Sequence, residues 1–221
     1  MENCVKEDLY KYLRSVGELD ERMPECPDVA DAWRKIAEAY LPDGIREFSG
    51  YPMVSLGWMM FLGMAIAQFW DENWTEYGQN TNIYEMLRDK RGYDNMDEYI
   101  LEEVLRLDAE KRRQTSQLVG ECASRTLAIL RNSDIEAGTE DAFRGYVACL
   151  RQMYLYGAAV QLNRLGYHMT LIYKIPCSGV ISRPAASTSC RSFFITSAGI
   201  HLRSTLTVRT RLRLRTMSIG A

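Results

Sequence analysis

A chain of 221 residues with 47% hydrophobic and 25% charged side chains can bury one sizeable core, and this composition argues against a fibrous or wholly disordered protein. Acidic residues are confined to residues 1–174, where 29 of them accompany 20 basic side chains, so this part carries a net charge of −9. Nucleic-acid-binding domains need a clustered basic surface, so we expect no nucleic-acid partner for this region.

The cysteines show no metal-binding spacing. They stand at positions 4, 26, 122, 149, 177 and 190, with no CxxC pair among them. The sequence therefore predicts no zinc site, no redox motif and no cofactor. The acidic N-terminus lacks the features of an export signal, and we expect a cytoplasmic protein with reduced thiols.

The first two predicted elements are amphipathic helices. The first is predicted to end near Gly17, because apolar residues recur before it at steps of three and four. A second is expected to follow the prolines at 24 and 27, with Asp28 as its N-cap. The sequence Pro42-Asp43-Gly44 is a turn signal, and it predicts the end of this helix.

Residues 53–70, MVSLGWMMFLGMAIAQFW, form an uncharged apolar segment. A membrane-spanning helix needs about 20 apolar residues, so a membrane-associated protein anchored by this segment is one alternative. The segment is short for that role, contains Gly63 and Gln68, and ends directly in Asp71-Glu72. We therefore expect a central core helix over about residues 52–72 rather than a membrane span.

Further helices are predicted after residue 82. A short one begins near Ile83 and is stopped by Gly92, and Asn95 with Glu98 fits a capping box for the next. Apolar positions between 118 and 130 indicate another helix. A last long helix is expected between Thr139 as N-cap and Gly166 as the C′ residue.

These elements together predict an all-α domain over residues 1–174. No proline occurs between Pro52 and Pro176, as a helix-rich region requires. The expected architecture is an irregular bundle of about six to seven helices around the central apolar helix, with short connections between antiparallel neighbours.

Functional residue types are densest around the ends of the apolar segment. They form one candidate ligand site: Arg46, Glu47, Tyr51, Trp58, Asp71 and Trp74. One interpretation is a pocket with aromatic walls and a few polar groups. The other is a helix end carrying interfacial aromatics and capping charges.

Catalytic and metal-binding signatures are absent, so the catalytic residues are unknown. There is no GxSxG, P-loop, GxGxxG or HExxH sequence. A di-iron bundle needs Glu-x-x-His on two helices, whereas position 165, three before His168, is leucine. The sequence therefore predicts no metal site and leans against an enzyme.

Residues 175–221 differ from the rest of the chain. They contain seven arginines, no lysine and no acidic residue, and helical periodicity is lost. Three interpretations compete: a basic arm for nucleic acid or anionic lipid, a disordered appendage, or an out-of-frame translation that replaced the natural C-terminus. In each case this tail is expected to lie outside the helical fold.

The segments GIREFSGYPMVSLGWMMFLGMAIAQFWDENW and MDEYILEEVL resemble uncharacterised bacterial all-helical proteins of unknown function. The resemblance implies an all-helical fold and a bacterial source, and it implies no activity, substrate or catalytic residue.

The leading functional hypothesis is a cytoplasmic helical binding domain, for a protein partner, a second copy in a homo-oligomer, or a small ligand near the central helix. The alternatives are a small enzyme with an aromatic and carboxylate pocket near Tyr51, Asp71 and Trp74, and the membrane-anchored protein.

Overall fold

The computed structural model describes residues 1–78, 82–136 and 138–172, and this part of the chain is an all-α bundle. Its α-helices are α1 (Glu2–Ser15), α2 (Pro27–Gly50), α3 (Pro52–Tyr77), α4 (Ile83–Arg91), α5 (Met96–Tyr99), α6 (Ala109–Arg131) and α7 (Glu140–Arg164). A short 3-10 turn, Tyr93–Asn95, precedes α5, and a π-helical turn, Ile100–Val104, follows it. The predicted tail over residues 175–221 lies outside the described residues.

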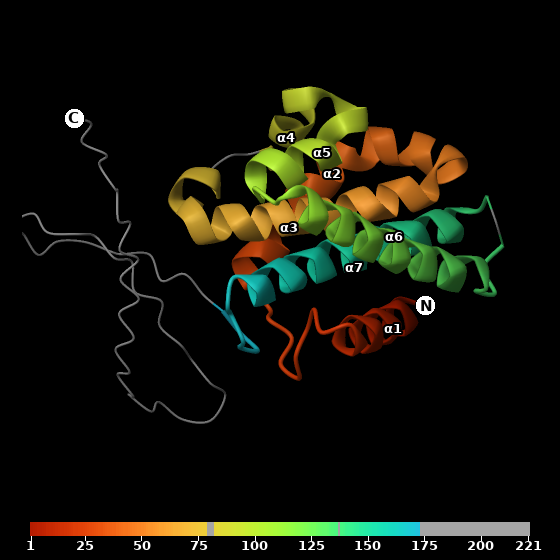
Figure 1. Cartoon of the computed structure of the whole chain (residues 1–221). Helices are drawn as coiled ribbons and strands as arrows, with labels where there is room; N and C mark the ends of the chain where they lie inside the picture. The colour runs from red at the N-terminus through yellow and green to blue at the C-terminus, as the bar shows by residue number, and fades with distance from the viewer. Residues whose placement is uncertain (79–81, 137, 173–221) are drawn as a thin grey trace, which may run out of the picture.

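The apolar helix α3 occupies the centre of the bundle. It contacts α2, α4, α5, α6 and α7, whereas α1 packs against α6 and α7 at the periphery. Figure 1 shows α3, α6 and α7 running side by side, with α4 and α5 at one edge and α1 at the opposite edge. The prediction of an all-α bundle around a central apolar helix is confirmed.

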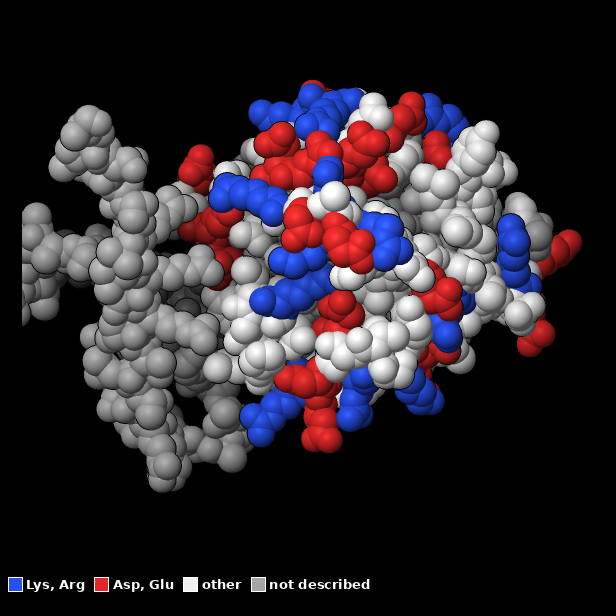
Figure 2. Space-filling view, in the orientation of Figure 1, with Lys and Arg blue, Asp and Glu red and all other residues white. Residues whose placement is uncertain are grey.

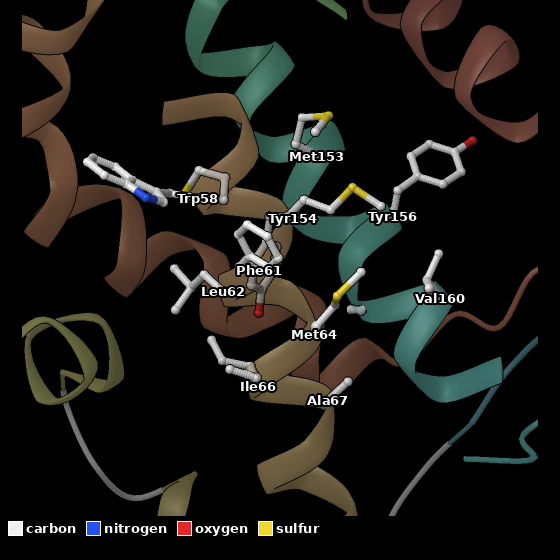
Figure 3. Close-up of a cluster of buried hydrophobic side chains, with 14 of the residues drawn as sticks. Trp58, Phe61, Leu62, Met64, Ile66, Ala67, Met153, Tyr154, Tyr156 and Val160 are labelled. Carbon is white, nitrogen blue, oxygen red and sulfur yellow. The ribbon is translucent and has the colours of Figure 1, made fainter. Parts of the chain in front are cut away.

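The most extensive packing joins α3 to α7, because glycines let the two backbones meet. A Cβ atom at Gly63 would lie 2.0 Å from the carbonyl oxygen of Tyr154, and one at Gly157 would lie 2.0 Å from that of Met60. Figure 3 shows the buried side chains around this crossing, including Met64 of α3 and Val160 of α7. Only glycine fits at these two positions without moving a helix.

By length and composition α3 is the one helix among the described residues that could cross a membrane. However, 83% of its apolar window is buried inside the fold. Apolar residues all round a helix are expected where neighbouring helices cover every side, which is the arrangement found here.

Several helix ends match the local signals. Thr139 caps α7, since its Oγ1 accepts a hydrogen bond from the backbone N–H of Ala142 at 3.2 Å. Gly92 ends α4 with φ +82°, and Gly166 follows α7 with φ +93°. These positive φ angles suit glycine, which has no Cβ to clash.

Two predicted boundaries and one predicted capping box are wrong. Helix α2 continues through Pro42 to Gly50, because Tyr40 and Glu47 on either side keep the same face buried while the proline ring faces solvent. Asn95 makes no capping box, since its side-chain amide donates instead to the carbonyl of Arg91. The N-cap of α2 is Cys26 rather than Asp28, and Pro27 takes the first helical position.

The segment after α7 returns to the linker between α1 and α2. An isolated parallel bridge pairs Leu171 with Glu25, and the N–H of Ile172 donates to the carbonyl of Glu25 at 2.9 Å. This contact ties the last described residues to the start of α2.

Candidate functional site

The six predicted site residues fall into two groups at opposite ends of α3. Tyr51 precedes the first residue of α3, whereas Asp71 lies in its sixth turn and Trp74 follows a kink at Asn73. A helical rise of 1.5 Å per residue places Tyr51 and Asp71 about 30 Å apart. The structure therefore does not bring Tyr51, Asp71 and Trp74 into one pocket, as the enzyme alternative requires.

At the first end, Arg46 and Glu47 lie together near the end of α2. The Nε atom of Arg46 is 3.2 Å from Oε1 of Glu47, and its Nη2 is 3.9 Å from Oδ1 of Asp43. Glu47 is buried, whereas the Arg46 side chain is 66% exposed. These contacts balance the guanidinium charge within α2 and leave little net charge at the surface.

Asp43 links this end of α2 to α4, a role that the expected turn did not suggest. Its Oδ2 accepts a hydrogen bond from the hydroxyl of Tyr84 at 3.0 Å and lies 3.6 Å from Nη1 of Arg88. Burial and the neighbouring carboxylate raise the pKa of Tyr84. The tyrosine therefore remains a neutral donor, and the contact is structural.

The remaining residues of the first group differ in exposure. Trp58 is a core side chain of α3 (Figure 3), whereas Tyr51 is 69% exposed at the junction of α2 and α3. The structure thus places Trp58 in the packed interior and Tyr51 on the surface.

At the second end, Asp71 belongs to an anchor between α3 and neighbouring segments. Its Oδ1 accepts a hydrogen bond from the hydroxyl of Tyr167 at 2.6 Å. The adjacent Trp70 packs edge-to-face on the Tyr167 ring and donates its indole N–H to Oδ2 of Asp28 at 3.0 Å. The two carboxylates thus bind groups from different helices and fix the end of α3.

Trp74 lines a cavity of about 260 Å³ between α2, the end of α3 and the start of α4. Its polar lining includes Asp28, Asp31 and Lys35 of α2. These three were not predicted as site residues, because they lie about 40 positions before Trp74 and only the packing of α2 beside α3 brings them there. The arrangement of an indole with two carboxylates and an ammonium group can hold a small polar ligand.

A larger cavity of about 500 Å³ lies between α1, the linker before α2, and α7. Its apolar wall includes Val29, Leu155 and Leu162, and its polar rim includes Glu2 and Arg151. No local motif could have predicted it, because its lining comes from four separate stretches of the sequence.

Five large apolar side chains are exposed where α2 meets α3, and we call them the α2–α3 corner surface: Leu41, Ile45, Tyr51, Met53 and Val54. Figure 2 shows largely uncharged surface at this end of the molecule. Leu41 and Ile45 lie one helical turn apart on α2, and the other three surround the start of α3. An apolar surface of this kind can bind another protein without any reactive group.

Two of the cysteine thiols are buried and unreactive. Burial raises the pKa of the Cys149 thiol to about 11 and that of Cys122 to about 12. Both thiols are therefore protonated at neutral pH, and a thiol is a poor nucleophile. Within residues 1–78, 82–136 and 138–172, no group of three or more His, Cys, Asp or Glu side chains could hold a metal ion.

Comparisons with known proteins add no relative: no family model, no curated protein and no solved structure matches this chain.

Proposed function

We propose that the chain is a cytoplasmic helical binding domain that contacts a protein partner through the α2–α3 corner surface. The observation that carries this proposal is the exposure of Ile45 and Tyr51, 58% and 69%, in a protein whose other large apolar side chains are mostly buried. The five side chains of the surface expose on the order of 500 Å². This area lies within the range of the largest apolar patch on a typical monomer, about 300–600 Å², and such a patch is often functional.

The corner surface has the composition of an interface core. It combines an aromatic residue and a methionine, Tyr51 and Met53, with aliphatic neighbours, and aromatic residues and methionine are enriched in interfaces. The exposed charge within its own stretch of α2, Arg46, is balanced by Asp43 and Glu47. Charged groups are depleted at interface cores because their desolvation costs free energy.

The cytoplasmic assignment is supported by the thiols. Cys4, Cys122 and Cys149 form no disulfide, and the last two sit in the core as small apolar groups. The burial of α3 supports a soluble domain rather than a membrane anchor.

Photo-crosslinking in living cells tests this proposal. A photoreactive amino acid at Ile45 should give a discrete adduct with a partner, and Tyr51→Asp in the same chain should abolish it. The matched control places the photoreactive group at Val16, another exposed apolar residue at the end of α1, where we expect no adduct. Equal labelling at both positions, or none at Ile45, would contradict a binding role for the corner.

A second candidate function is small-ligand binding in the cavity between α1, α2 and α7. Its volume of about 500 Å³ falls within the usual range for ligand sites, about 300–1,000 Å³, and it combines an apolar wall with a polar rim. Native mass spectrometry of protein from its own host should then detect a bound molecule. Ala158→Phe, which adds a ring at the cavity wall, should remove that molecule.

A further inference from the structure

We propose that the partner on the α2–α3 corner surface is a second copy of this chain, in a two-fold symmetric dimer. This inference rests on the proposed function, because it names the occupant of the same surface. In a two-fold dimer one patch contacts the identical patch, so the patch must match itself in charge and chemistry. An uncharged apolar surface meets that requirement.

The charge distribution selects this face for contact between two copies. Residues 1–174 carry a net charge of −9, which the seven arginines of residues 175–221 reduce to −2 for the full chain, so repulsion between two copies arises only where their acidic patches meet. Between Leu41 and Val54 the only charged residues are Asp43, Arg46 and Glu47. Glu47 is buried and Asp43 is held by Tyr84 and Arg88, so this stretch of α2 and α3 is nearly neutral. At the start of α7, whose Phe143 packs against Phe48, Arg144 is paired with Glu140 and Asp141.

The size of the surface suits a dimer. A standard interface buries about 800 Å² on each partner. The five apolar side chains supply roughly 500 Å² of this. Uncharged residues that border them supply the remaining area: Pro42, Ser49, Gly50 and Pro52. Tyr51 provides the large aromatic side chain that interface centres favour.

Two other occupants fit the surface less well. The tail over residues 175–221 carries seven arginines and is attracted to acidic surface rather than to a neutral corner. It also follows the far end of α7, about 32 Å along the helix from Phe143, which packs against Phe48 beside the corner at 5.5 Å. An anionic lipid surface repels the acidic domain.

Sedimentation equilibrium of the full chain over a hundredfold range of concentration tests the dimer. The wild-type chain should approach twice its monomer mass, and Ile45→Asp or Tyr51→Asp should raise the dissociation constant at least thirtyfold. Val16→Asp is the matched control, because it places the same charge at an exposed apolar residue outside the corner and should leave the dissociation constant unchanged. Circular dichroism should show equal helix content in all three variants.

Salt provides a second readout. Because the interface is apolar and the full chain carries a net charge of only −2, added salt should not weaken the dimer. A contact between the basic tail and an acidic surface would weaken with salt instead, and that result would overturn the proposal.

A wild-type chain that remains monomeric at every concentration would also overturn the dimer, as would a dimer insensitive to both corner variants. The cellular adduct at Ile45 separates this failure from failure of the proposed function. An adduct at twice the mass of the chain supports self-association. An adduct with a different protein, from a chain that is monomeric in solution, would retain the binding role of the corner and reject the second copy as its partner.

Discussion

The apolar segment over residues 53–70 has an exposed start and a buried main part. From Ser55 to Ala67 every residue of α3 is buried, and α7 crosses this region closely enough that two glycines are required. Met53 and Val54, which come directly before this buried stretch, are exposed together with Ile45 of α2. Apolar composition therefore predicts burial only where another helix supplies a covering face. Where none does, the same residue types remain exposed at the surface.

The largest effect is expected at the α3–α7 crossing. Gly63→Ala would place a methyl group against the carbonyl of Tyr154, so α7 must move, and we expect a loss of at least about 3 kcal/mol in the free energy of unfolding. Gly120→Ala is the control, because a Cβ there has no neighbour within 4 Å and should stabilise α6 by up to about 1 kcal/mol. Urea unfolding measures both. A Gly63→Ala chain as stable as wild type would refute the close crossing.

Isoleucines in the two regions offer a direct comparison. Ile66→Ala empties space in the core and should cost about 2–5 kcal/mol, whereas Ile45→Ala at the corner should change stability by no more than about 0.5 kcal/mol. Thermal and urea unfolding of the two variants check the difference. Similar losses in both would mean that the corner is covered by the chain itself.

The buried thiols predict an alkaline limit to stability. The folded-state pKa values of Cys149 and Cys122, about 11 and about 12, lie above that of an unfolded thiol, so the folded state retains protons that the unfolded state loses. Stability is therefore complete below about pH 8.5 and should fall by on the order of 2 kcal/mol or more as pH rises toward 11. Urea unfolding at several pH values measures the decline.

Cys149→Ala is the control for this pH dependence. It removes one of the two thiols, so its stability should fall less steeply between pH 8.5 and 11 than that of wild type. An unchanged slope would show that Cys149 does not contribute to the alkaline decline.

A smaller effect is expected from the hydroxyl of Tyr154. It donates a 2.6 Å hydrogen bond to the carbonyl of Val29 and so joins α7 to α2 in the interior. Tyr154→Phe should cost about 1 kcal/mol. The exposed hydrogen bond from Tyr10 to the carbonyl of Glu21 is the matched contact, and Tyr10→Phe should cost less, because water replaces the lost partner. Equal costs would show that burial does not strengthen the contact.

Local chemistry explains which predictions from the sequence are correct. Thr139 at the start of α7 and the glycines at 92 and 166 act through atoms within a few residues of themselves. The local signals at Pro42 and Asp28 were misleading because packing in the folded chain decides the roles of both residues. Buried side chains on both sides of Pro42 keep α2 continuous, and the indole of Trp70, 42 residues away, takes the carboxylate of Asp28.

The arrangement of the candidate site residues was not predictable from the sequence. Arg46 pairs with Glu47, and Trp74 lines a cavity, but the length of α3 separates these two places. The carboxylates and the lysine that complete the cavity come from α2, whose sequence carries no sign of that role. The exposure of Ile45 and Met53 was also not predictable, since their apolar character is equally suited to a core.

The sequence by itself determined the helical class, the central position of the apolar segment and several helix ends, because periodicity and capping depend on residues within one or two turns. Only the tertiary structure decided which apolar residues α7 covers and which remain on the surface, and which polar residues face a common cavity. Those outcomes depend on how closely distant helices approach, and here Gly63 and Gly157 set the approach of α3 and α7.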